Sequence, residues 1–547
     1  MRTAKDSTAK GGSAEVGAGR AVRGGALRAV LAGGVSGAVA GFAALAAAEL
    51  VSAAVRPEAG PVVAVGGAAI DRTPPAVKDW AIREFGTADK LVLQWGILAV
   101  LALFAMALGV LAVRHRVAGA AGVLLFGVVG AWAALGRPDS TGFGDALPSV
   151  AGAAAGAVLL YVLAGCAVRP VPPGPDQVAE AAPGVWDRRR FVVVTSAVAA
   201  ASAGAGVLGR TLNAARGQDA VASRRRIRLP APASAAAPVP AGARLQVPGI
   251  SAFVTPNEDF YRVDTALVVP KVDAGTWRLT IHGKGVRRPV TVSFDDLLRR
   301  RLVERDITLT CVSNEVGGPY AGNARWLGVP LAELLAECGV EPPARGGPAD
   351  QLVARSVDGM TIGTPVDDVM DGRDALLALG MNGEPLPFAH GFPVRMVVPG
   401  LYGYVSACKW IEDIELTTFD AYDPYWVRRD WAREAPVKTQ SRIDTPKPFA
   451  RPRAGTVTVA GVAWAQHRGI DKVELRVDDG PWQRAELAAE DTRDTWRQWS
   501  YRWRATPGDH TLTVRATDRT GRTQTARRTR TVPDGASGRH SVVVTVT

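Results

Sequence analysis

Five long apolar runs near the start of this 547-residue chain constrain its fold more than any other feature. A helix of about 20 apolar residues spans the hydrocarbon core of a bilayer, and each run is long enough to do so. Soluble packing of Ala-rich helices is the alternative, but the runs carry almost no charge. We therefore predict a multi-span α-helical membrane region at residues 29–209, preceded by a cytoplasmic tail at residues 1–28. The five runs are residues 29–51, 91–113, 117–135, 148–168 and 191–209.

Arginine clusters at the ends of these runs predict their orientation. The clusters precede the first run, separate the second from the third, and precede the fifth, so all of them fall on one side. Basic loops stay in the cytoplasm, and an odd number of spans then places the large C-terminal half outside it. We predict a multi-pass protein of the cell membrane whose helices act as an anchor. Glu49 is the only acidic residue inside a predicted span, and it either functions there or reaches the interface. The clusters are Arg20, Arg23 and Arg28; Arg114 and Arg116; and Arg188, Arg189 and Arg190.

The remainder of the chain has a different composition. The net charge of +12 is spread over dispersed arginines without a nucleic-acid-binding motif, so we predict no nucleic-acid partner. Residues 210–249 are basic and then Pro/Ala rich, which is typical of a linker. Short strand patterns mixed with one helical segment predict an α+β domain at residues 250–436, and alternating strands predict an all-β sandwich at residues 440–547.

The segment NGEPLPFAHGFPVRMVVPGLYGYVSACKW, residues 382–410, places three basic side chains in a backbone punctuated by glycine and proline. Such turns allow close backbone approach, and His390, Arg395 and Lys409 together suit a bound anion such as phosphate. The alternative is an ordinary loop with scattered basic residues.

A second block, ITLTCVSNEVGG at residues 307–318, contains one of four cysteines in the chain. Cys311 ends a β-like run, at the strand-to-loop edge where functional sites are common. Its thiolate would suit a soft metal, whereas a buried structural thiol is the alternative. Cys166, Cys338 and Cys408 show no metal-site spacing, and the last two can pair only if the fold brings them together.

Together with GNARWLGVPLAELL from Gly322, these two blocks resemble sulfite oxidase-type molybdopterin-dependent oxidoreductases, here in a membrane-anchored bacterial form. The resemblance covers about residues 250–547. It implies a molybdenum-molybdopterin cofactor, an α+β molybdopterin domain and a C-terminal Ig-like dimerisation domain. By position it implies that Cys311 is the metal ligand and that the pterin phosphate is bound by His390, Arg395 and Lys409. Asn257, Asp259 and Tyr261, in TPNEDFYRVD, would belong to an early cofactor-contact loop or simply to a turn before a strand.

The resemblance also implies a substrate pocket around Cys311. We predict that Asn314, Arg325, Asp430 and Trp431 shape this pocket. Pocket cations of sulfite oxidases are missing, because Pro256 and Glu258 stand where those enzymes have Arg and His, and Glu315 and Val316 replace paired arginines. Trp431 replaces the active-site tyrosine. These departures favour a neutral or larger substrate such as a sulfoxide, although Arg325, Arg428 and Arg429 can restore positive charge.

The predicted function is oxygen-atom transfer on a small sulfur compound. No haem, flavin or iron–sulfur motif occurs in the sequence, so electrons require a separate donor or acceptor. A homodimer through the C-terminal domain is a further possibility. The alternatives are a sulfoxide reductase of the same fold and a non-catalytic, membrane-tethered binding protein.

The segment DRRRFVVVTSAVAAASAGAG, at the start of the fifth run, resembles a twin-arginine export signal. Such a route would let a domain fold around its cofactor before crossing the membrane. The alternative is a stop-transfer helix with basic flanking residues.

Overall fold

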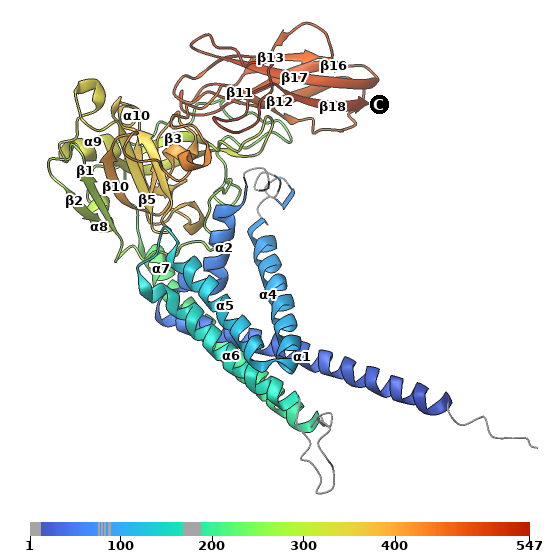
Figure 1. Ribbon diagram of the computed structural model, residues 1–547. Helices are drawn as coiled ribbons and strands as arrows, with labels where there is room; N and C mark the ends of the chain where they lie inside the picture. The colour runs from blue at the N-terminus through green and yellow to red at the C-terminus, as the bar shows by residue number, and fades with distance from the viewer. Residues whose placement is uncertain (1–11, 75–76, 78–79, 81–83, 86–88, 168–187) are drawn as a thin grey trace, which may run out of the picture. The chain divides into compact units, whose positions relative to one another are not determined.

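The computed structural model describes residues 12–74, 77, 80, 84–85, 89–167 and 188–547. The chain divides into two compact units, residues 1–216 and residues 217–547. Figure 1 shows the helices of the first unit and the strands of the second.

The first unit is helical. Within the described residues, five helices are long and apolar enough to cross a membrane, and each predicted run lies in one of them, apart from residue 168, which is not described. The first of these helices begins inside the predicted tail, whose residues 1–11 lie outside the described part of the chain. The helices are α1 (Gly12–Ala54), α2 (Pro61–Arg72), α4 (Asp89–Arg114), α5 (Arg116–Leu135), α6 (Leu147–Ala167) and α7 (Arg188–Arg226), with short 3-10 turns η1 (Pro57–Ala59) and η3 (Phe143–Ala146).

Small residues bring α1 close to its neighbours. A Cβ atom at Gly37 of α1 would collide with the carbonyl of Ala105 in α4, and one at Gly156 of α6 would lie 2.8 Å from Ala44 Cβ. Helices in a bilayer gain little from apolar burial against each other, so backbones that approach closely through glycine and alanine supply the packing. Glu49 does not stand alone, because Asn213 Nδ2 of α7 donates to its carboxylate at 2.8 Å.

Helix α7 is longer than the sequence pattern suggested. It continues through residues 210–226, the first part of the predicted linker, because this stretch contains no proline before Pro230. Residues 227–249 are not helical and lie along the second unit, where Ala233 N donates to Leu302 O at 2.8 Å.

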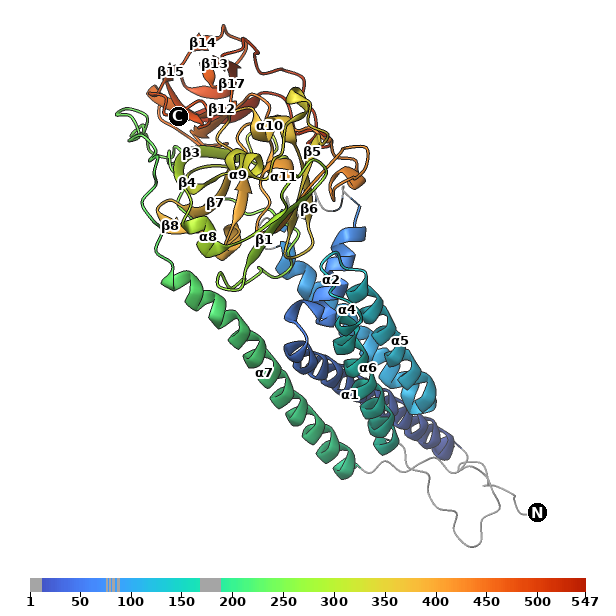
Figure 2. The ribbon, with the colours of Figure 1, turned by 90° about the vertical axis from the view of Figure 1, so that its left-hand side faces the viewer.

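The second unit contains the predicted α+β domain, which is built on two five-stranded sheets. The first has the strand order β2-β1-β10-β5-β6, and the second has β3-β4-β7-β8 with β9 paired to β7. Figure 2 shows the short helices beside the strands of this domain. Apolar side chains of the helices and of both sheets form one core, in which Trp326 and Phe392 are fully buried. The strands are β1 (Arg278–Gly283), β2 (Val290–Ser293), β3 (Val303–Thr310), β4 (Ala321–Pro330), β5 (Gln351–Ser356), β6 (Thr361–Pro365), β7 (Leu376–Met381), β8 (Glu384–Pro385), β9 (Arg395–Val397) and β10 (Ile411–Thr417). The helices are α8 (Phe294–Leu298), α9 (Leu331–Glu337), α10 (Val366–Met370) and α11 (Gly403–Ser406), with 3-10 turns η4 (Pro343–Arg345), η5 (Phe388–His390) and η6 (Val427–Arg429).

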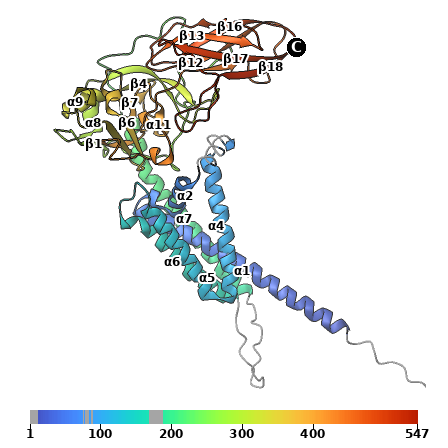
Figure 3. The same cartoon turned by 45° about the horizontal axis from the view of Figure 1, so that its top comes forward.

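The C-terminal domain is the predicted β-sandwich. Its two four-stranded sheets have the orders β11-β12-β16-β15 and β14-β13-β17-β18 (Figure 3). Alternate side chains of both sheets meet in a core that contains Trp499 and Trp503, as two packed sheets require. All four cysteines are free thiols, so Cys338 and Cys408 do not pair. The strands are β11 (Gln440–Thr445), β12 (Gly455–Trp464), β13 (Ile470–Val477), β14 (Gln483–Arg484), β15 (Glu486–Leu487), β16 (Arg497–Ala505), β17 (Gly508–Asp518) and β18 (His540–Val546).

Candidate active site

Cys311 follows directly after β3 and its thiol is buried. The backbone N–H of Cys311 donates to Tyr320 O at 2.9 Å, and a turn returns the chain so that Asn314 N donates to Cys311 O at 3.1 Å. Burial raises the pKa of the thiol, while the Ser313 hydroxyl and N–H groups and the positive charge of Lys409 act in the opposite direction. These donors would stabilise a thiolate, which is the form that ligates a metal.

His390, Arg395 and Lys409 come together in a cluster that we call the basic cradle. An Arg395 Nη1 group donates to His390 O at 3.2 Å, and the guanidinium lies 5.0 Å from the ring centroid of Trp326. Burial lowers the pKa of Arg395 to about 10. Burial and the charges of Arg395 and Lys409 lower the pKa of His390 to about 4. Burial and the two neighbouring positive charges therefore favour the neutral form of the His390 ring.

The basic cradle fits an anion. Among the buried side-chain atoms of the described residues, His390 Nδ1 and Arg395 Nε have no hydrogen-bond partner. Unsatisfied buried polar atoms cost about 1 to 3 kcal/mol each. An anion that accepted from Arg395 Nε, and from His390 Nδ1 once the anion had favoured the protonated imidazolium, would offset that penalty. Lys409 already binds Asp264 at 2.8 Å and contributes mainly its charge. A phosphate group on a pterin matches these donors in charge and in chemistry.

The early loop contributes two of its three predicted residues. The backbone carbonyl of Asn257 lies 2.9 Å from His390 Nε2, and Asn257 Oδ1 accepts from Asn382 Nδ2 at 2.9 Å. Burial raises the pKa of Tyr261 well above its usual range, with the Cys311 charge adding to the effect and Arg395 opposing it. Tyr261 is thus near enough to interact electrostatically with both the thiol and Arg395 of the cradle. Asp259 is exposed, and its backbone N–H closes a turn to Pro256 O.

Asn314 is placed beside Cys311, but Arg325 is not in the pocket. The Asn314 side chain accepts from Tyr320 N at 2.8 Å and closes the loop that follows the cysteine. Arg325 Nη2 and Nε instead bind Asp306 at 2.6 and 2.9 Å, and Nη2 also donates to Ala237 O. Successive side chains of a strand point to opposite faces. Because Trp326 of β4 lies against Arg395, its neighbour Arg325 faces away from the cradle.

The segment after η6 lies farther from the thiol. Trp431 is mostly buried, with its ring centroid 5.6 Å from that of Tyr404 in α11. Helix α11 approaches the site at Gly403, where an added Cβ would lie 3.9 Å from Tyr261 Oη. Trp431 therefore supports the pocket wall through Tyr404, whereas Asp430 is exposed and adopts a left-handed backbone with φ of 65°.

Two residues near Cys311 were not predicted from the sequence. Ser313 supplies a hydroxyl and an N–H group to the thiol. Tyr402 is buried, and burial raises its pKa above the usual range, with the Cys311 charge contributing. The paired tyrosines of LYGYV inside the basic block were the available signal for Tyr402. The position of Ser313, two residues after the cysteine, was the signal for the other residue.

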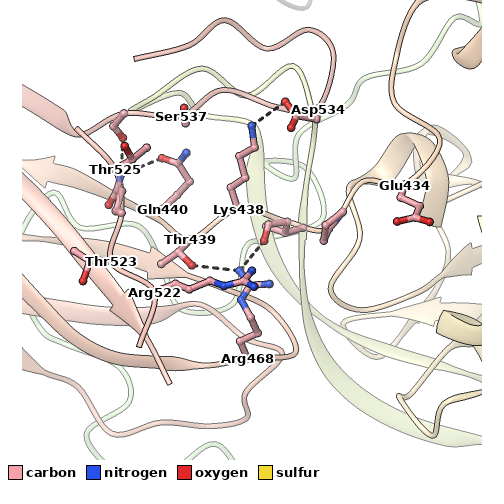
Figure 4. Close-up of a pocket in the computed structure, with 14 residues that line it drawn as sticks. Glu434, Lys438, Thr439, Gln440, Arg468, Arg522, Thr523, Thr525, Asp534 and Ser537 are labelled. Carbon is pink, nitrogen blue, oxygen red and sulfur yellow. Dashed lines mark hydrogen bonds and ion pairs between the residues drawn. The ribbon is translucent and has the colours of Figure 1, made fainter. Parts of the chain in front are cut away.

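A cavity of about 400 Å³ lies at the seam between the α+β domain and the sandwich. Lys438 reaches Asp534 at 2.9 Å across it, and Arg468 donates to Val437 O and Thr439 Oγ1 (Figure 4). Cys311 does not line this cavity. The hydroxyl of Tyr402 accepts from the N–H of Lys438, one of the lining residues, at 3.4 Å. The cavity is therefore separate from the basic cradle.

Comparison with known proteins agrees with this geometry. Residues 266–426 match the family described as Oxidoreductase molybdopterin binding domain, and residues 440–514 match Bacterial Ig domain. Mitochondrial sulfite oxidase from Mus musculus is 32% identical over 290 residues, which is 45% of this chain and 52% of that one. The Homo sapiens enzyme is 30% identical over 305 residues, which is 48% and 55% of the two chains. The chain thus spans about half the length of these curated relatives. The sulfane dehydrogenase SoxCD from Paracoccus pantotrophus aligns with a TM-score of 0.47 and 25% identity over 55% of this chain and 84% of that one.

The α+β domain is therefore a sulfite oxidase-type molybdopterin-binding domain followed by a bacterial Ig domain. These matches support the predicted molybdopterin-dependent oxidoreductase class and the predicted molybdenum-molybdopterin cofactor. These predictions are confirmed, and the non-catalytic alternative is not supported. The residues present fit the cofactor. Groups that donate to the Cys311 thiol would stabilise a metal-binding thiolate, and the unpartnered atoms of the basic cradle suit a phosphate.

Proposed function

We propose that this protein is a membrane-anchored, extracytoplasmic oxidoreductase that transfers an oxygen atom to or from a small sulfur compound. The observation that carries the proposal is the placement of a buried cysteine at the end of β3 together with a buried, partly unpartnered basic cradle. The similarity to sulfite oxidases supports sulfur as the reacting element.

Each part of the site has a separate role in the proposal. The bound molybdenum cofactor supplies two-electron oxygen-atom transfer chemistry. Cys311 ligates the metal as a thiolate, and the Ser313 hydroxyl and N–H groups hold that negative charge. His390, Arg395 and Lys409 orient the pterin through its phosphate. Asn257 fixes the His390 ring by accepting from Nε2, which leaves Nδ1 as the nitrogen that the protonated ring would offer to a phosphate.

The charge of the pocket bears on the substrate. The three arginines that could replace the missing pocket cations make other contacts. Arg325 binds Asp306, Arg428 lies over Tyr422, and Arg429 lies 3.5 Å from the ring centroid of Tyr425 while donating to its carbonyl. A dianion such as sulfite needs cations at its binding position, whereas a neutral sulfoxide does not. Sulfoxide reduction is therefore the second candidate within the same chemistry.

The two reactions run in opposite directions. Sulfite and water would yield sulfate, two electrons and two protons, and the electrons would pass to an acceptor. A sulfoxide with two electrons and two protons would yield a sulfide and water, and a donor would supply the electrons. Either direction requires the separate redox partner that we propose. Similarity to sulfite oxidases also supports the proposal of a homodimer through the Ig domain.

The five apolar helices and their basic flanks support the anchor and the orientation. The proposed export route depends on Arg189 and Arg190. Replacing both with lysine should leave the Ig domain accessible only from the cytoplasmic side in a protease-protection assay. Normal external exposure of that variant would exclude the twin-arginine route.

The deciding experiment for the activity uses the full-length protein, purified in detergent from a host that makes the cofactor. Wild type should contain about one molybdenum and one pterin per chain, as expected for one site. Turnover is then compared for sulfite with an artificial electron acceptor and for methyl sulfoxides with a reduced dye. Cys311→Ser should keep the pterin and lose both activities. Folded wild-type protein without molybdenum or pterin would overturn the proposal.

A further inference from the structure

We propose that the Ig domain positions the metal-binding cysteine of its own chain, with Gln466 as the main positioning residue. This inference rests on the proposed role of Cys311 as a metal ligand. It assigns the Ig domain a function within one subunit, which is independent of any contact between subunits.

The first observation is that β3 is an edge strand. Its sheet has the order β3-β4-β7-β8, so β3 has a neighbouring strand, β4, on one side only. An edge strand leaves N–H and C=O groups without ladder partners, and those groups need other acceptors and donors. Near the start of β3 the segment before the domain meets this need, because Glu304 N donates to Ser234 O at 2.8 Å.

The Ig domain covers the other end of the same edge, next to Cys311. Thr308 N donates to Asp494 O at 2.9 Å, and Trp496 N donates to Thr308 Oγ1 at 2.7 Å. Gln466 Nε2 then donates to Thr308 O at 3.0 Å and to Thr310 Oγ1 at 2.9 Å. Thr310 is the residue before Cys311. Side-chain and backbone groups of the Ig domain therefore hold the last residues of β3, directly before the thiol.

The loop after Cys311 is held by the same domain. Arg442 Nη1 donates to Gly318 O at 2.8 Å, and the guanidinium is fixed in turn by Asp444 at 2.7 Å. The ring of His540 lies where a Cβ atom of Gly317 would be, and Gly317 has a φ of +83° that favours glycine. Contacts from the Ig domain thus flank Cys311 on both sides in the sequence.

Gln466 is well suited to this task because it is fully buried and makes no bond within the Ig domain through its amide nitrogen. A metal–thiolate bond depends on the position of the sulfur, and displacement of a reacting group by about 1 Å can cost about 100-fold in rate. Loss of groups that support a metal ligand costs about 10- to 100-fold in metal affinity or activity. We expect Gln466 to fall in this range.

The chain offers a matched control in Gln498. It is as buried as Gln466 and also joins the Ig domain to other parts of its unit, through bonds to Ser251 O at 2.7 Å and from Leu245 N at 2.6 Å. Neither partner belongs to β3, and Gln498 bonds the backbone of Ser251, whereas Arg442 bonds the hydroxyl of that residue. Gln466→Met and Gln498→Met each remove a buried amide and its two hydrogen bonds at nearly constant side-chain volume, so they separate general stability from positioning.

The experiment compares both variants with wild type as full-length holoprotein. Gln466→Met should lower kcat by about 10- to 100-fold with little change in KM, and it should shift the thiolate-to-metal absorption band. Gln498→Met should lose comparable thermal stability, because a buried hydrogen-bonded amide is removed. Its kcat should stay within about twofold and its absorption band should be unchanged, because Gln498 makes no bond to β3 through its side chain. Identical bands and equal kcat values in the two variants would overturn the inference.

Two further measurements keep the test decisive. If Gln466→Met does not fold, Thr310→Val removes one of the two bonds while keeping the side-chain shape, and it should shift the band in the same direction by a smaller amount. In apoprotein from a host without the cofactor, alkylation of Cys311 by iodoacetamide, followed by peptide mass mapping, should be several-fold faster in Gln466→Met than in Gln498→Met. This measurement needs no metal, so it separates a failed positioning role from a failed assignment of the cofactor site.

Discussion

Two groups of basic side chains in the molybdopterin-binding domain make opposite use of their charge. His390 and Arg395 are buried beside the half-buried Lys409, and one nitrogen atom of each buried residue has no hydrogen-bond partner among the described residues. Arg325 is bound by Asp306, and Arg428 and Arg429 lie over tyrosine rings. A buried cation without an acceptor is costly, whereas a paired or half-exposed one is stable as it stands. The first group therefore indicates a ligand, and the second group indicates a structural role.

The sharpest test of this comparison is Arg395→Met, which has the largest expected effect. Cofactor binding should weaken by about 2 to 5 kcal/mol, roughly 30- to 4,000-fold, because a phosphate would lose its buried partner. The apoprotein should be as stable as wild type or slightly more stable, since an unpaired buried charge is removed. Molybdenum and pterin content after gel filtration, with thermal unfolding of both forms, measures the two effects. Retention of full cofactor content in Arg395→Met would contradict the assignment of the basic cradle as the phosphate-binding group.

Arg325→Met should show the reverse pattern. Asp306 is almost fully buried, and removal of its partner leaves a buried carboxylate uncompensated, at a cost of about 3 to 5 kcal/mol of stability. The molybdenum content per folded chain should remain at the wild-type level. Chemical denaturation and metal analysis of the same preparation would check this. Loss of cofactor without loss of stability would place Arg325 in the pocket after all.

His390 provides a smaller effect that depends on pH. Its pKa is lowered to about 4 in the folded apoprotein, below an unfolded value of about 6.5. The unfolded state therefore binds more protons between these values, and stability falls as pH drops from 6.5 to 4, by about 2 to 3 kcal/mol. A bound phosphate favours the charged imidazolium, so the holoprotein should lose less. His540 shares this direction, because its pKa is also lowered to about 4. The difference between wild type and His390→Gln isolates the contribution of His390.

Asp430→Asn should have the smallest effect. The side chain is exposed, and the backbone there has a left-handed conformation that asparagine also tolerates. Stability should change by less than about 0.5 kcal/mol and kcat by less than about twofold. Steady-state kinetics with the substrate that wild type turns over would measure it. A tenfold loss of kcat would return Asp430 to the pocket.

Local patterns in the sequence determined the parts of this protein that depend on neighbouring residues. The apolar runs predicted five long helices because hydropathy acts along a single segment, and alternating strands predicted the sandwich. Turn residues around His390 and Arg395, and the strand end at Cys311, predicted the candidate site because proline, glycine and strand termini shape the backbone locally.

Only the tertiary structure decided features that depend on residues far apart in the chain. Arg325 faces Asp306 because of the register between β3 and β4 and the alternation of side chains, which a motif match does not reveal. Gln466 reaches Thr308 across 158 positions, since an edge strand must be completed by whatever segment packs beside it. Sequence patterns report local backbone preference, whereas the partners of buried polar groups are chosen only when distant segments meet.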